Sequence, residues 1–257
     1  PRDSFGKVAD STRPASLHYD YWRGPAEMVP YNEKKVHYNW HWHWATGNGD
    51  TGNQGPHQFD VARWGMNKNE HPVSVYSAGG IYGIDPNDCS QETPNTQSSV
   101  FKYADGTMLE FETRGRYTNG ESSLGIEIGN VFYGTNGYLE LDGGTWKAFR
   151  QKEKEPFAQS KKQAAPAAST QVLAAPGGAE HYANFLDAIR AGNNETLHCD
   201  IEEGFKSSVL PLIANVSYLT GRELRFDGTT EKFVKDKEAD KMLTRDYRDP
   251  YTVPNKV

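Results

Sequence analysis

The chain has 257 residues, a formal net charge of −6 and a pI near 5.8, with 36% hydrophobic and 12% aromatic residues. This length and composition suffice for a packed globular core. The acidic balance excludes a sequence-wide attraction to nucleic acid or to an anionic membrane surface, and no apolar run of about 18 residues predicts a membrane span.

The N-terminal third predicts a lead-in, a strand, a loop and a helix. Residues 1–34 are rich in Pro, Gly and charge, and predict an extended lead-in that crosses a surface. From His37 to Trp44, polar residues occupy odd positions and aromatic residues occupy even positions, which predicts a strand because the period is two. Residues 47–55 predict a loop, and Pro56 predicts the first turn of a helix. His57 would then lie at the helix N-terminus.

The middle of the chain predicts six further strands and one long loop. Gly and Asn-Gly links between them predict an antiparallel meander. Leu109 and Phe111 alternate with Glu110 and Glu112, so one face of this sheet should be covered and the other left polar. Residues 153–178 show no periodicity and predict a mobile loop. The predicted strands are 73–82, 98–103, 107–114, 126–133, 138–141 and 145–150.

The C-terminal third predicts helices. Two lie at 179–191 and 202–220, and a charged helix with a Pro-containing tail falls within 236–257. Pro211 predicts a kink or break near Ser207, because proline removes a backbone donor and clashes with the preceding turn. Strands followed by helices favour an α+β fold. We expect one domain over residues 35–257, with an open, predominantly antiparallel sheet and helices on one face.

Residues 37–64 contain four histidines, four tryptophans and four glycines, a density that favours a site. His57 is the candidate acid/base. A general base must be neutral before it accepts a proton, and a helix N-terminus disfavours the charged imidazolium. Asn53 and Gln54 each have a side-chain amide, whose donor and acceptor can hydrogen-bond two vicinal hydroxyl groups of a sugar. Alternatively, these two side chains cap the helix. His41, His43 and Asp50 are candidates to bind substrate, and the two histidines equally fit bonds to loop backbone. Tryptophans 40, 42 and 44 offer a stacking surface or a core.

Several segments together resemble the C-terminal domain of the glucose-fructose oxidoreductase, inositol dehydrogenase and rhizopine-catabolism family. The resemblance implies a bacterial parent with an N-terminal Rossmann domain, absent from this chain, that holds NAD or NADP and a catalytic lysine in Glu-Lys-Pro. It also implies that the parent oxidises a sugar or polyol. This chain alone is expected to bind no cofactor and to be inactive. The segments are Trp22–Pro25, His37–Trp40, Gly47–Asp50, Gly52–Gly55, His57–Asp60, Ala62–Trp64, His181–Gly192, Ile201–Gly204, Ala214–Asn215 and Gly221–Arg222.

The same resemblance assigns roles to residues. The family's Asp-x-Gly-x-His element falls on Asn53, Gly55 and His57, so the histidine is retained and an amide replaces the carboxylate. His57 and Asn53 are therefore the catalytic candidates. Gly47–Gly52 matches the spacing of a dinucleotide fingerprint, but it lacks the aliphatic strand before it and the helix that opens at its last glycine.

Two other classes of function stay open on sequence alone. One is a metal-dependent hydrolase or lyase that uses His37, His41, His43 and His57. The other is a non-catalytic carbohydrate-binding or dimerisation module. For the oxidoreductase, we expect a homodimer or homotetramer built through the open sheet face, in the bacterial cytoplasm or periplasm, with no nucleic-acid or membrane partner.

Overall fold

The computed structural model describes residues 3–116, 128–142, 145–160 and 178–252. The chain forms two compact units, residues 1–127 with 208–257, and residues 128–207. Each unit has its own antiparallel sheet. The single domain predicted over residues 35–257, and its boundary at residue 34, stay predictions.

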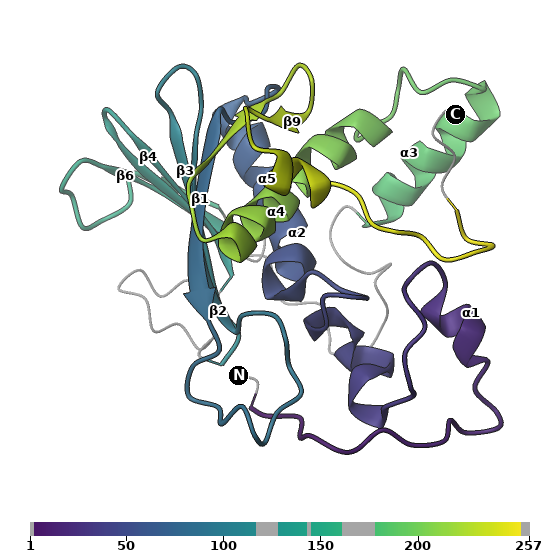
Figure 1. The fold of residues 1–257 in the computed structure, drawn as a ribbon. Helices are drawn as coiled ribbons and strands as arrows, with labels where there is room; N and C mark the ends of the chain where they lie inside the picture. Colours follow the sequence, from purple (N-terminus) through teal and green to yellow (C-terminus); the bar gives the residue numbers. More distant parts are fainter. Residues whose placement is uncertain (1–2, 117–127, 143–144, 161–177, 253–257) are drawn as a thin grey trace, which may run out of the picture. The chain divides into compact units, whose positions relative to one another are not determined.

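Helical elements come first along the chain, seven consecutive strands follow, and helices and two short strands complete it (Figure 1). The helical elements are α1 (Tyr19–Arg23), η1 (Glu33–Lys35), η2 (His37–Trp42), α2 (Gly49–Met66), α3 (Gly178–Ala191), α4 (Ile201–Thr220) and α5 (Lys237–Lys241). The strands are β1 (Ser74–Gly80), β2 (Thr96–Lys102), β3 (Met108–Arg114), β4 (Gly129–Gly134), β5 (Gly137–Asp142), β6 (Thr145–Arg150), β7 (Ala158–Gln159), β8 (Leu224–Asp227) and β9 (Lys232–Phe233).

All six predicted strands form, and every pair is antiparallel. The prediction that they build one sheet is wrong. The first unit contains a five-stranded sheet in the order β3-β2-β1-β8-β9, and the second contains the four-stranded sheet β4-β5-β6-β7. Strand β8 follows α4 and pairs with β1, a contact between distant segments that local periodicity does not reveal. Strand β7 lies inside the stretch predicted as a loop.

One face of the first sheet carries the core. Val75, Phe101 and Leu109 are buried there, and Phe59 of α2 packs its ring 5.3 Å from the ring of Phe101. The opposite face exposes Glu110 and Glu112, as their alternation with Leu109 and Phe111 predicts. The fold class is therefore confirmed: an α/β chain with open antiparallel sheets and few helices.

Helix α4 is continuous through Pro211, so no break occurs near Ser207, and the alternative of a kink there stays a prediction. Its residues Leu210, Ile213 and Ala214 are fully buried, and burial of a helix face outweighs the backbone bond that proline removes. Gly55 of α2 explains how the two helices approach: a Cβ at Gly55 would lie 3.4 Å from the Cβ of Pro211.

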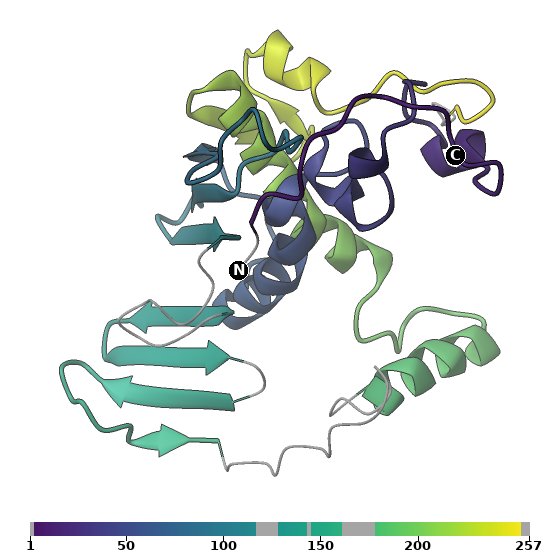
Figure 2. The same ribbon diagram turned by 90° about the horizontal axis from the view of Figure 1, so that it is seen from below.

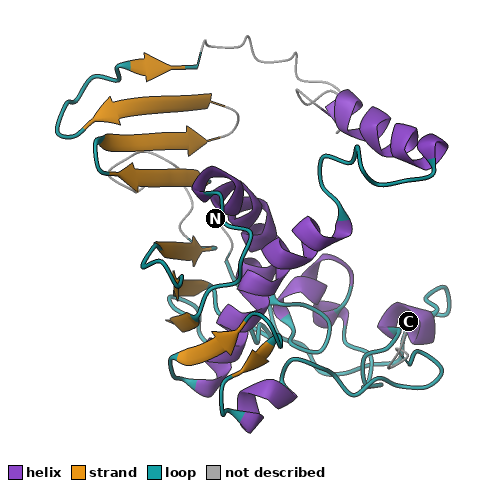
Figure 3. Ribbon diagram, turned by 90° about the horizontal axis from the view of Figure 1, so that it is seen from above, coloured by secondary structure: helices purple, strands orange, loops and turns teal. Residues whose placement is uncertain are grey.

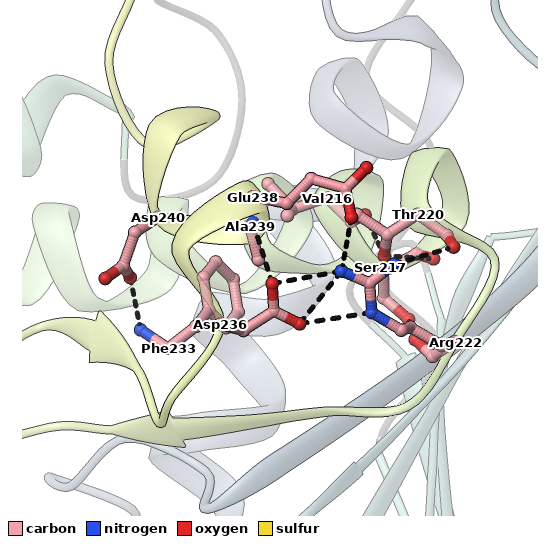
Figure 4. A network of polar contacts seen from close by, with 9 residues as sticks. All are labelled: Val216, Ser217, Thr220, Arg222, Phe233, Asp236, Glu238, Ala239 and Asp240. Atoms are coloured by element: carbon pink, nitrogen blue, oxygen red, sulfur yellow. Dashed lines mark hydrogen bonds and ion pairs between the residues drawn. The ribbon is translucent and has the colours of Figure 1, made fainter.

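The end of α4 is tied to α5 by an ion-pair network (Figure 4). The Arg222 guanidinium donates from Nε and Nη2 to both carboxylate oxygens of Asp236, at 2.9–3.1 Å, and from Nη2 to Glu238. Asp236 also accepts from the backbone N–H of Ala239 and so caps α5. This backbone bond, followed by the ion pair with Arg222, lowers the pKa of Asp236. Of the helix predicted within residues 236–257, the described residues 236–252 contain one short helix, α5.

The second unit places its strands in a regular ladder, visible as alternating arrows in Figures 2 and 3. Tyr138 of β5 stacks on Phe149 of β6 with ring centroids 4.6 Å apart. Asp200 begins α4 as an N-cap residue, because its side chain accepts from the N–H groups of Glu202 and Glu203. Within the described ranges, no helix has both the length and the apolarity required to cross a bilayer.

Candidate functional site

Helix α2 carries four of the six candidate site residues, but its start differs from the prediction. It begins at Gly49 and contains Pro56 in its interior, so the loop predicted over residues 47–55 is largely the first two turns of helix. His57 therefore lies in the middle of α2. The macrodipole acts mainly within the first turn, so the predicted effect of a helix N-terminus on the His57 imidazole does not apply.

Buried polar groups hold the first turns of α2 against the sheet and α4. The Thr51 hydroxyl donates to Gln97 Oε1 at 2.9 Å. Gln97 Nε2 donates to the Ser77 hydroxyl at 2.9 Å and to Asn215 Oδ1 at 3.1 Å. Asn215 Nδ2 then donates to the Asn48 carbonyl just before the helix. This network gives a Gly-rich, Pro-containing segment the tertiary contacts that its low helix propensity requires.

The network is the part of the site that sequence reasoning missed. Thr51, Gln97 and Asn215 are 1%, 2% and 4% exposed, and buried polar side chains need partners that only the folded chain supplies. The one available signal was an asparagine at position 215, between apolar residues of a helix.

Asp50, Asn53, Gln54 and His57 are spaced by three and four residues, so they follow one side of α2. Asn53 and His57 are exposed, and no hydrogen bond to either side chain comes from the described part of the chain. Asp60 lies one turn beyond His57 and is also exposed. This side of α2 presents an amide, an imidazole and a carboxylate to solvent, a set that can bind hydroxyl groups and exchange a proton with one of them.

Residues 37–42 form the 3₁₀ helix η2, so the strand predicted over residues 37–44 is wrong. The backbone N–H of Asn39 bonds to the Val36 carbonyl, and that of His43 to the Trp40 carbonyl. The side chains bond locally too: His41 Nδ1 donates to the Tyr38 carbonyl at 2.6 Å. An alternating sequence forms a strand only when a neighbouring strand pairs with its backbone N–H and C=O groups. In η2 these groups form hydrogen bonds within the segment instead.

The η2 segment is joined to α2 through Asp50. Trp42 is buried, and its Nε1 donates to Asp50 Oδ1 at 3.0 Å. Of the three tryptophans weighed for stacking, Trp42 is thus a core residue. Trp40 lies 41% exposed and stacks on His41 with ring centroids 4.0 Å apart.

His41 and His43 are buried rather than on the exposed side of α2. His43 Nε2 donates to the Lys34 carbonyl, and its Nδ1 lies 3.3 Å from Glu92 Oε1. The contact with His43, together with the backbone N–H of Trp44, lowers the pKa of Glu92, while partial burial opposes this. Substrate contact by His41 and His43 stays a prediction.

Three of the four histidines of the metal alternative are held in separate surroundings. His41 bonds to backbone, His43 faces Glu92, and His57 lies on the exposed side of α2. No group of three or more His, Cys, Asp or Glu placed to hold a metal ion occurs within the described ranges.

The sequence matches the C-terminal alpha/beta domain of the oxidoreductase family Gfo/Idh/MocA over residues 5–253. The chain belongs to this family. The resemblance drawn from short motifs is thereby confirmed across nearly the whole chain. A comparison with curated proteins returned no match.

Solved structures share the fold of this Gfo/Idh/MocA domain. Aldose-aldose oxidoreductase from Caulobacter crescentus, complexed with glycerol, is 16% identical, with a TM-score of 0.50 over 73% of this chain and 50% of that one. Levoglucosan dehydrogenase, in complex with NADH and L-sorbose, is 13% identical, with a TM-score of 0.53 over 74% and 54%. The chain thus spans about half the length of these relatives. At such identities the likeness concerns the fold.

Proposed function

We propose that this chain is the substrate-binding and oligomerisation part of an NAD(P)-dependent oxidoreductase that acts on a sugar or polyol. The observation that carries the proposal is the position of His57 and Asn53. They are exposed one helical turn apart on α2, and they match the histidine and carboxylate positions of the family's Asp-x-Gly-x-His element. In this role His57 takes the proton of the substrate hydroxyl, and Asn53 and Gln54 orient that hydroxyl.

The names of the structural relatives support the class of substrate and cofactor. One is an aldose-aldose oxidoreductase and another a levoglucosan dehydrogenase bound to NADH. A bound nicotinamide accepts hydride in such reactions. In this proposal, residues of this chain make the polar contacts to the substrate, and a Rossmann domain of the parent protein binds the nucleotide.

Titration with nicotinamide nucleotides tests whether the nucleotide binds outside this chain. Gly47–Gly52 does not form a phosphate-binding turn between a parallel strand and a helix, because η2 precedes it and Gly49–Gly52 is already helical. We expect calorimetry on the purified 257-residue chain to show no saturable binding of NAD(H) or NADP(H) below millimolar concentration, whereas the intact enzyme binds one of them. Micromolar binding by the chain alone would contradict the proposal.

The exposed face of the first sheet is the proposed self-association surface. Tyr76 of β1 and Met108 of β3 are 47% and 58% exposed there, among the charged side chains of Glu110 and Glu112. Apolar side chains mixed with charges suit a self-complementary contact across a twofold axis. This supports a homodimer or homotetramer formed sheet to sheet.

Light scattering on this chain tests the surface. At tens of micromolar protein we expect twice or four times the monomer mass of 28.8 kDa. The Tyr76→Asp variant should shift toward monomer, because association would bury the new carboxylate in the contact. Tyr21→Asp is the matched control, since Tyr21 of α1 is 76% exposed but lies outside the sheet. A wild-type mass near 28.8 kDa, or an equal response to both substitutions, would exclude this surface.

A further inference from the structure

The η2 segment leaves two aromatic side chains open to solvent. Tyr38 is 71% exposed and Trp40 is 41% exposed, while their neighbours His41 and Trp42 are buried. Side chains three residues apart eclipse in a 3₁₀ helix, which places Tyr38 over His41 with ring centroids 4.9 Å apart. Trp40 stacks on the same imidazole at 4.0 Å. We call Tyr38 and Trp40 the aromatic ledge.

The buried rings beneath the ledge make it rigid. The His41 ring is fixed by its bond to the Tyr38 carbonyl, and the Trp42 ring lies edge-on to Tyr38 at 5.6 Å. Aromatic rings held in this way lose little conformational entropy when a ligand packs on them. The two outermost rings stay exposed, so they offer apolar ring surface to a ligand.

The ledge is connected to the proposed catalytic side of α2 through Trp42. Trp42 supports the ledge and donates to Asp50 Oδ1 at 3.0 Å. Asp50 begins the series that leads through Asn53 to His57, seven residues and about 10 Å further along the helix axis. This distance exceeds one pyranose ring. A substrate that reacts at His57 and also reaches past Asp50 to the ledge must therefore contain more than one ring.

We infer that Tyr38 and Trp40 form a second sugar subsite, and that the substrate is a disaccharide or larger glycoside. The inference rests on the proposed function and specifies its substrate class. Tyr and Trp combine an apolar ring with a polar group, which suits the apolar ring face and the hydroxyl rim of a pyranose. Along α2, Asn53 and Gln54 lie between His57 and Asp50, which accepts from Trp42, and these polar side chains supply the few oriented groups such a site needs.

Steady-state kinetics of the intact enzyme test the subsite. The probes are cellobiose, maltose and lactose against glucose and galactose, with NAD⁺ or NADP⁺ reduction as the readout. For the preferred disaccharide, Tyr38→Ala and Trp40→Ala should each lower kcat/KM about tenfold, which corresponds to about 1.4 kcal/mol. The kcat/KM for the component monosaccharide should change less than about twofold.

Trp64→Ala is the matched control. Trp64 is an exposed tryptophan of α2, 82% exposed, seven residues beyond His57 and away from the contact between η2 and Asp50. It should leave the ratio of disaccharide to monosaccharide kcat/KM unchanged. Equal losses for both sugars, no loss in the ledge variants, or an equal effect of Trp64→Ala would overturn the inference.

A binding readout separates this inference from the proposed function. If none of the probes is oxidised, saturation-transfer NMR with the same disaccharides tests the ledge independently of the proposed function. Transfer to a disaccharide that is lost in Tyr38→Ala and kept in Trp64→Ala supports the subsite. The absence of transfer to every disaccharide in the wild-type protein overturns it.

Discussion

In the intact enzyme, His57→Ala is expected to lower turnover by about 10²-fold or more, the loss typical of removing a positioned acid or base. The side chain is exposed on α2, so its removal should change the free energy of unfolding by less than about 0.5 kcal/mol. The measurement is kcat for NAD(P)⁺ reduction, with the denaturation midpoint recorded for both proteins. An unchanged kcat would make His57 a surface residue without a role in the chemistry.

Asn53→Asp provides the complementary comparison. It restores the carboxylate of the family's Asp-x-Gly-x-His element one turn before His57. A negative charge at this position stabilises the imidazolium formed when His57 takes a proton. We expect the lower pH limit of activity to move upward in this variant. A pH profile identical to that of the wild-type enzyme would show that position 53 does not act on His57.

Gln97→Ala is expected to destabilise the first unit by about 2–4 kcal/mol, because it leaves buried polar partners without hydrogen bonds and creates a cavity. Gln97 is 2% exposed and bonds to Thr51, Ser77 and Asn215 at once. Urea denaturation followed by circular dichroism measures the change. The loss should come with weaker order in the first turns of α2, seen as faster amide exchange around Thr51.

Ser98→Ala is the matched control for Gln97→Ala. Ser98 is the next residue of β2, and its side chain lies on the exposed face of the sheet. A surface substitution of this kind usually changes stability by less than about 0.5 kcal/mol. If both variants lose equal stability, the network around Gln97 is not what holds α2.

The sequence by itself determined the family, the fold class and most strands. Strands β1 to β6 all lie where alternation and turn residues predicted them, because hairpin pairing depends on neighbouring segments. The motif that aligns Asn53, Gly55 and His57 with the family is likewise contained in five residues.

Only the tertiary structure decided how those elements assemble and where the site lies. Strand β8 pairs with β1 across more than half of the chain, and strands β3 and β4 lie in different sheets, so the single predicted sheet is two sheets. The network of Gln97 and Asn215 extends α2 back to Gly49, and the local bonds of η2 replace the predicted strand. The start of α2 depends on hydrogen bonds between residues far apart in the sequence, which outweigh the low helix propensity of Gly and Pro. In η2, backbone bonds between residues three apart outweigh the strand preference that alternation indicates.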